Sequence, residues 1–159
     1  FEVRDLLNKT KDPIKAVKTL QDENTSLKKQ IDQLLKDKAQ NLSGEIKSRL
    51  QEINGVQFLA TKIDLDQNGI KNLAFAIGKE HDNLFLLFAS SEKKDKAMLT
   101  CYISKELANE RGYNAGTVVR ELGKLIHGGG GGQNFFATAG GKNPGGIPKA
   151  LEGAKDYIV

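Results

Sequence analysis

The residue types that catalysis needs are scattered along this chain of 159 residues. His81 and His127 are its two histidines, and neither belongs to an HExxH pair. The sequence also lacks a GxSxG nucleophile motif and any cluster of Asp and His spaced to hold a metal ion. Asp64 and Asp66 stand where a strand is expected to give way to a helix, and a carboxylate there usually caps the helix. We therefore expect no catalysis by this chain and no metal ion in it.

The segment LIHGGGGGQNFFATAGG, from Leu125 to Gly141, has the character of a contact surface. Thirteen of the 17 glycines follow Arg111, and that stretch contains no serine, whereas flexible linkers are rich in both Gly and Ser. Few residues follow the run, too few for another domain. We expect Gly128 to end a helix in the left-handed conformation. The next glycines are expected to form a loop whose N–H groups make an anion-binding nest.

Known nucleotide motifs do not fit this segment. In the P-loop pattern Ser or Thr follows Gly-Lys, but Asn143 follows Gly141-Lys142 and Phe136 occupies the place of its first glycine. The dinucleotide fingerprint fails because Gln133 takes the place of its third glycine. Binding of ATP or NAD is therefore not expected. The remaining candidate ligand is a larger partner that carries ribose and phosphate.

RNA outside base-paired grooves is recognised through phosphates, 2′-hydroxyls and stacking of exposed bases. The lysines that flank the segment, Lys124, Lys142 and Lys149, could pair with phosphates. Its polar residues could bind ribose or base edges, and one phenylalanine could stack on a base. Each has a plainer alternative: a solvated charge, loop polarity, a core ring or, for His127, a helix C-terminal cation. If Phe135 and Phe136 lie on a strand they point to opposite faces, so at least one belongs to the core. The candidate nucleic-acid contacts are Lys124, His127, Gly128, Gly129, Gly130, Gly131, Gly132, Gln133, Asn134, Phe135, Lys142, Asn143 and Lys149.

Composition limits the class of protein further. The net charge of +4 and the pI near 9.1 permit an anionic partner without requiring one. The single cysteine, Cys101, excludes an internal disulfide, and its apolar surroundings favour a buried side chain over a reactive thiol. No stretch has the ~20 apolar residues of a membrane span, and the charged start resembles no signal peptide. Because the chain begins with Phe1 inside a helix-like pattern, we expect a piece of a longer cytoplasmic protein.

Residues 1–54 are expected to form a helical dimerisation arm. Asp12 and Pro13 are a good helix start, and Asn54-Gly55 is the expected stop. A helix of that length measures roughly 60 Å, so its narrow apolar seam needs another helix beside it. A second copy of the chain is the expected partner, although the upstream part of the parent protein is an alternative. The seam consists of Val17, Leu20, Asn24, Leu27, Ile31 and Leu34, with Asn24 of the type that fixes register, and after a phase slip Leu35, Ala39, Leu42, Ile46 and Ile53 continue it.

Residues 55–159 are expected to form a small mixed α/β domain. The patterns predict a strand over 56–65, a helix over 66–81, a strand buried on both faces over 83–90 and its hairpin partner over 97–104. A helix capped by Asn114, the glycine-rich loop, a short strand over 135–139 and a helix from Pro148 follow. The fold class is therefore α+β: a long coiled-coil-like helix, then a small globular domain.

This order of elements, with HGGGGGQNFFATAGG and the amphipathic end IPKALEGAKDYI, resembles the C-terminal domain of alanyl-tRNA synthetases. The same substrate-binding type of domain follows the catalytic domain of DHH-type phosphoesterases. The likeness covers essentially the whole chain, and its most specific part is the glycine run followed by Ala139-Gly140-Gly141. Phosphoesterases usually carry a histidine within this motif, whereas here His127 precedes the run and Gln133 follows it, which favours the synthetase branch.

The resemblance implies a dimeric appendage whose globular part contacts the outer corner of the L-shaped tRNA. The parent would attach alanine to tRNA and hydrolyse mischarged tRNA, and its upstream domains would hold ATP, Mg²⁺ and, if the parent uses it, Zn²⁺. We expect no cofactor in this chain itself. Two alternatives remain: the nucleic-acid-binding domain of a DHH-type phosphoesterase, and a purely structural coiled-coil assembly module.

Overall fold

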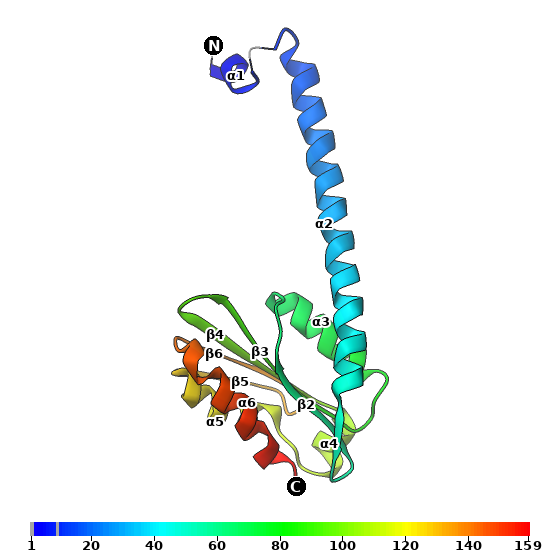
Figure 1. Cartoon of the computed structure of the whole chain (residues 1–159), viewed down its shortest axis with the longest axis vertical. Helices are drawn as coiled ribbons and strands as arrows, with labels where there is room; N and C mark the ends of the chain where they lie inside the picture. The colour runs from blue at the N-terminus through cyan, green and yellow to red at the C-terminus, as the bar shows by residue number, and fades with distance from the viewer. Residues whose placement is uncertain (1, 9) are drawn as a thin grey trace. The chain divides into compact units, whose positions relative to one another are not determined.

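The structure is a computed structural model that describes residues 2–8 and 10–159, without the side chains of residues 2 and 4. Its contacts divide the chain into two parts, residues 1–42 and residues 43–159. The elements, drawn in Figure 1, are α1 (Glu2–Leu6), α2 (Pro13–Arg49), β1 (Gln51–Ile53), β2 (Val56–Lys62), α3 (Gln67–Gly78), β3 (Leu84–Lys93), β4 (Lys96–Ile103), α4 (Lys105–Glu110), α5 (Ala115–Gly123), the 3₁₀ turn η1 (Lys124–Ile126), β5 (Gly128–Gly132), β6 (Phe136–Gly141), η2 (Pro144–Gly146), α6 (Ile147–Gly153) and η3 (Ala154–Tyr157).

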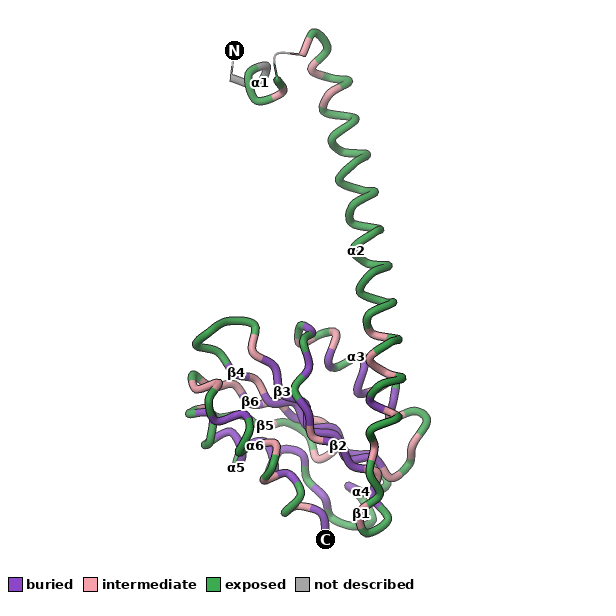
Figure 2. The backbone as a smooth tube through the Cα atoms, in the orientation of Figure 1, coloured by how far each residue is buried: buried purple, intermediate pink, exposed green. Residues whose placement is uncertain are grey.

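Helix α2 begins where the sequence predicts. The Asp12 carboxylate accepts the Lys15 N–H at 3.0 Å, and Pro13 is the first helical residue. The first part of the seam, Val17 to Leu34, is exposed, as Figure 2 shows for this stretch of α2, and Val17, the least exposed of its apolar residues, still retains 41% of its surface. The predicted continuation differs, because Ala39 and Leu42 are half-buried and Ile46 is buried in the core. A narrow apolar face of this kind has no partner within residues 10–42. No helix among the described residues is both long enough and apolar enough to cross a membrane.

The end of α2 differs from the prediction. The helix stops at Arg49, and residues 51–53 form β1, so Ile53 belongs to a strand and not to the seam. Asn54 and Gly55 have φ of 52° and 75° and make a tight hairpin turn that pairs Ile53 with Val56. An Asn-Gly pair is the strongest short hairpin signal because both positions need positive φ, and here it outweighs the helical period.

A six-stranded sheet forms the centre of residues 43–159, in the order β1-β2-β3-β4-β6-β5. Strands β2 and β3 run parallel with α3 as their crossover, and all other neighbours are antiparallel. The predicted strand-helix-strand-strand order is confirmed, including the buried run of β3 from Leu84 to Ser90. Asp66 caps α3 by accepting the Gly69 N–H at 2.7 Å, as its position in the sequence suggested.

Helices cover the sheet on both faces (Figure 1). Helix α3 lies on one face, and Lys47 of the last turns of α2 forms an ion pair with Glu80 just beyond the end of α3. Helices α5 and α6 pack on the other face over the main core, which includes Phe85, Leu87, Val118 and Ala139. The strands β1 and β5 and the helix α4 were not predicted. The α+β class is confirmed, but the glycine-rich part is a strand and not a loop.

Candidate nucleic-acid interface

The five glycines form β5, the last strand of the sheet. Gly128 pairs with Gly141 and Gly132 pairs with Ala137, so the whole run lies antiparallel to β6. The expected loop and anion-binding nest are therefore wrong. Ladder pairing to β6 holds the bare backbone in an extended conformation, and this pairing also excludes a flexible tether.

Alternate glycines of β5 are required for that pairing. A Cβ on Gly128 would lie 1.9 Å from the Gly140 carbonyl oxygen, one on Gly130 2.1 Å from the Thr138 carbonyl oxygen, and one on Gly132 2.6 Å from that of Phe136. All three contacts are with the backbone of β6, which cannot move away without breaking the ladder. A Cβ on Gly129 would meet nothing within 4 Å. A Cβ could thus be added at Gly129 without a clash.

Helix α5 holds β5 from the face of the sheet. A Cβ added to Gly123 would lie 3.8 Å from the Gly129 Cα, and one added to Gly116 would lie 3.1 Å from the Gly132 carbonyl oxygen. Two helical glycines therefore let α5 approach the strand closely, and the Ala115 N–H donates to the Asn134 carbonyl oxygen at 2.8 Å just beyond it. The strand is fixed along one edge and across one face.

The other edge of β5 presents backbone groups without side chains. The Gln133 N–H donates to the Phe136 carbonyl oxygen at 2.8 Å, which closes the ladder between β5 and β6. Because bonded and non-bonded positions alternate in an antiparallel pair, the N–H and C=O groups of Gly128, Gly130 and Gly132 point away from β6. Such an edge can donate to an anion and accept from a hydroxyl at a regular spacing.

Positive charge lies beside this edge, partly from a residue that the sequence did not indicate. The guanidinium of Arg120 on α5 lies 3.9 Å from the position of a Cβ on Gly131. Arg120 lies outside the glycine segment, and only the contact between α5 and β5 reveals it. Lys142 is exposed and directly follows Gly141, the partner of Gly128.

The other predicted cations and Asn143 have different positions. Lys124 is exposed but forms an ion pair with Glu121 at 2.7 Å. Lys149 is exposed on α6. His127, with φ of 52°, ends η1 in the left-handed conformation that the sequence assigned to Gly128, because Gly128 is already part of β5. Asn143 donates its backbone N–H to the Ile126 carbonyl oxygen at 2.9 Å and its side-chain amide to the Leu125 carbonyl oxygen at 3.3 Å, so it is held close to η1.

The residues between β5 and β6 turn toward the α3 face of the sheet. Gln133 is exposed and Asn134 half-buried. Phe135 and Phe136 are both half-buried, and both contact Phe75 of α3, with ring centroids 6.4 and 5.3 Å apart. The expectation that one of them joins the main core is wrong, because Phe135 precedes the strand and strand alternation does not apply to it.

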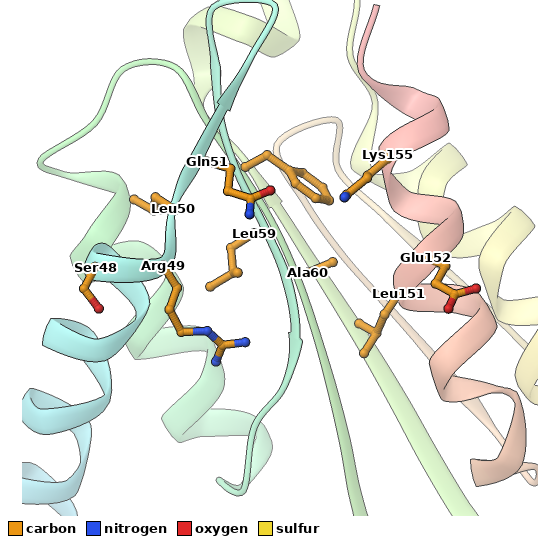
Figure 3. A pocket seen from close by; sticks show the side chains of 10 residues that line it. Ser48, Arg49, Leu50, Gln51, Leu59, Ala60, Leu151, Glu152 and Lys155 are labelled. Atoms are coloured by element: carbon orange, nitrogen blue, oxygen red, sulfur yellow. The ribbon is translucent and has the colours of Figure 1, made fainter.

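A hollow at the opposite end of the sheet contains none of the predicted residues. Figure 3 shows its lining side chains, with Arg49 on one side, Glu152 and Lys155 on the other and Leu59, Ala60 and Leu151 between them. The Arg49 guanidinium is already occupied by Glu45 and Thr61, each at 3.2 Å. This hollow therefore offers less free charge than the β5 edge does.

The metal-ligating residue types and the single thiol have the following placement. Residues 2–8 and 10–159 contain no group of three or more His, Cys, Asp or Glu placed to hold a metal ion. Cys101 is fully buried, as predicted, and burial raises the pKa of its thiol far above the usual range. A thiol that stays protonated is not a nucleophile.

Comparisons with known proteins agree with this architecture. The DHHA1 domain family model matches residues 55–159. The chain is 56% identical over 157 residues to an alanine–tRNA ligase of Christiangramia forsetii, and the alignment covers 99% of this chain and 18% of that protein. It is 40% identical over 152 residues to an alanine–tRNA ligase of Bacteroides fragilis, covering 95% of this chain and 17% of that protein. The chain thus spans less than a fifth of the length of these curated relatives.

A solved structure has the same fold. The C-Ala domain from Aquifex aeolicus alanyl-tRNA synthetase superposes with a TM-score of 0.60 at 28% sequence identity, over 69% of this chain and 97% of that one. From the family match, the relatives and this superposition, we conclude that the chain belongs to the DHHA1 domain family and has the fold of the C-Ala domain of alanyl-tRNA synthetases.

Proposed function

We propose that this chain is the tRNA-binding and dimerising C-terminal domain of an alanyl-tRNA synthetase. One structural observation carries the tRNA part: a side-chain-free strand, held rigidly at the sheet edge, lies beside Arg120 and Lys142. The names of the relatives and the C-Ala fold support the assignment to a synthetase. Attachment of alanine and hydrolysis of mischarged tRNA are proposed for the parts of the parent protein outside this chain.

The β5 edge suits a ribose-phosphate backbone. N–H groups of Gly128, Gly130 and Gly132 can donate to phosphate oxygens, while their carbonyl oxygens can accept from 2′-hydroxyls, which distinguish RNA from DNA. Without side chains the RNA can approach the main chain to hydrogen-bonding distance. Arg120 adds a planar guanidinium that can bind one phosphate through two hydrogen bonds.

Dimerisation is proposed through the exposed seam of α2. Val17, Leu20, Leu27, Ile31 and Leu34 expose between 41% and 67% of their surface, which is unfavourable for a helix that stays alone in water. A second α2 would bury these residues with Asn24 in the seam. Two domains in one dimer would each present a β5 edge.

The test is the binding of alanine-specific tRNA to this chain, measured by fluorescence anisotropy over a range of salt concentrations. Binding should weaken steeply as salt rises, because phosphate contacts release counterions. Lys142→Glu and Arg120→Glu should each weaken binding and reduce the salt slope by about one. Lys62→Glu is the matched control, since Lys62 is exposed on β2, across the sheet from β5. Equal binding by all four proteins, or no binding at low salt, would refute the proposal.

Gly129→Val tests the backbone contact itself. Because a Cβ at this position meets no protein atom within 4 Å, the fold should persist while the RNA is held away from the strand. A purely structural arm predicts instead that Gly129→Val and Lys142→Glu leave RNA affinity unchanged. A phosphoesterase parent would be recognised by a DHH motif upstream of this chain, and the ligase names of the relatives disfavour it.

A further inference from the structure

The phenylalanines between residues 10 and 159 fall into two groups by burial. Phe58, Phe85 and Phe88 are core residues with at most 3% of their surface exposed. Phe75, Phe135 and Phe136 are only half-buried. The second group comes from two distant parts of the sequence but gathers at one place. We call Phe75, Phe135 and Phe136 the aromatic patch.

Phe75 is the centre of the aromatic patch. Its ring centroid lies 5.3 Å from that of Phe136 and 6.4 Å from that of Phe135, and a third neighbour, Tyr102, lies at 5.2 Å in an edge-on arrangement. Because Phe75 is on α3 and Tyr102 on β4, the patch is anchored by two regular elements. The rings are therefore held in place before any ligand arrives.

The patch stays open because the sheet is unevenly covered. On β6, Ala137 and Ala139 are buried under α5, while Phe136, Thr138 and Gly140 face the other side and keep exposed surface. Helix α3 contacts β3 and β4 on that side. The β6 end of this face therefore remains accessible next to the aromatic patch.

Two lysines border the patch. The Lys71 ammonium lies 5.8 Å from the Phe136 ring centroid and the Lys105 ammonium 5.2 Å from that of Phe135. Both are exposed, and neither forms an ion pair with any residue that the structure describes. Cations of this kind would oppose a purely apolar partner, but they suit a ligand that is both flat and anionic.

We propose that the aromatic patch binds an unpaired RNA base by stacking, with Lys71 and Lys105 moving from the rings to the flanking phosphates. This inference rests on the proposed RNA-binding function. The patch continues from the β5 edge through Gln133 and Asn134, so one strand could follow the glycines and then place a base on Phe135. Stacking is tolerant of sequence because every base has a π face, so the patch adds affinity without selecting one base.

The test uses a short single-stranded RNA that contains 2-aminopurine, whose fluorescence falls when it stacks. Wild-type chain should quench this probe at saturation. Phe135→Leu and Phe136→Leu keep an apolar side chain but remove the ring, and each should weaken binding about tenfold. Phe135→Tyr keeps the ring and should bind as the wild type does. Phe58→Leu, in the buried group, controls for general loss of packing.

The outcomes separate this inference from the function on which it rests. If both Leu variants bind and quench as the wild type does, the stacking site is wrong, even when Lys142→Glu weakens binding. If the Leu variants weaken binding while Lys142→Glu and Arg120→Glu do not, the patch stands and the β5 edge is refuted. If the wild type binds neither this probe nor tRNA, both proposals fail.

Discussion

Two neighbouring glycines of β5 should respond to alanine in opposite ways. In Gly130→Ala the new Cβ would lie 2.1 Å from the Thr138 carbonyl oxygen and 2.4 Å from the Ala139 Cα, so β5 and β6 must separate. In Gly129→Ala the new Cβ meets nothing within 4 Å, and the φ of Gly129 is not positive. The effect alternates because a Cβ added at Gly130 would point at β6, whereas one added at Gly129 would not.

The expected changes in the free energy of unfolding differ in sign between the two variants. Overpacking a filled site costs about 1–3 kcal/mol, and here the clash is with backbone, so ladder hydrogen bonds are lost as well. We expect Gly130→Ala to destabilise the globular part by roughly 3 kcal/mol or more, which lowers Tm by roughly 10 °C. Gly129→Ala only restricts the unfolded chain and should stabilise it by about 0.4–1 kcal/mol.

Urea denaturation followed by tyrosine fluorescence is the suitable assay. All three tyrosines, Tyr102, Tyr113 and Tyr157, lie in residues 43–159, so the signal reports on that part and not on the helical arm. Equal midpoints for the two variants, or a loss of stability in Gly129→Ala as large as in Gly130→Ala, would show that β5 is not held against β6 as described.

Three further outcomes are expected. Leu27→Asp should convert the proposed dimer to a monomer, as measured by light scattering, because Leu27 lies in the seam. Glu23→Ala is the control outside the seam and should stay dimeric. A wild type that is already monomeric would contradict the proposal. The Cys101 thiol should resist iodoacetamide at about pH 8 until urea unfolds the chain, because burial raises the pKa of this thiol. Rapid labelling of the native protein would argue against that burial. The hydrogen bond from Lys47 lowers the pKa of the Glu80 carboxyl. The pair therefore contributes fully to the stability of the fold at pH values above the ordinary pKa of Glu, about 4.3. That contribution to stability is lost as the pH falls through the lowered pKa of Glu80. The unfolding free energy of Glu80→Gln should therefore decline less steeply than that of the wild type as the pH is lowered. The same decline in both proteins would count against the pair.

Local patterns predicted most of the regular elements. Alternation and apolar runs indicated β2, β3 and β4, and Asp66 and Asn114 marked two helix starts whose caps the structure contains. These predictions hold because capping and burial patterns depend on residues only a few positions apart. The heptad pattern of the seam could also be identified from the sequence. The identity of its partner stays a prediction.

Pairing between distant segments decided the rest. A run of five glycines has no side-chain pattern, so nothing local distinguishes a strand from a loop, and β5 exists only because β6 accepts it and α5 covers it. Arg120 joins the candidate site for the same reason, and Phe75 meets Phe135 through contacts between α3 and the β5–β6 turn. The sequence by itself determined which segments are helix, buried strand or glycine. Only the tertiary structure decided which backbone stays bare, because a close approach between strands is a property of two segments and not of either alone.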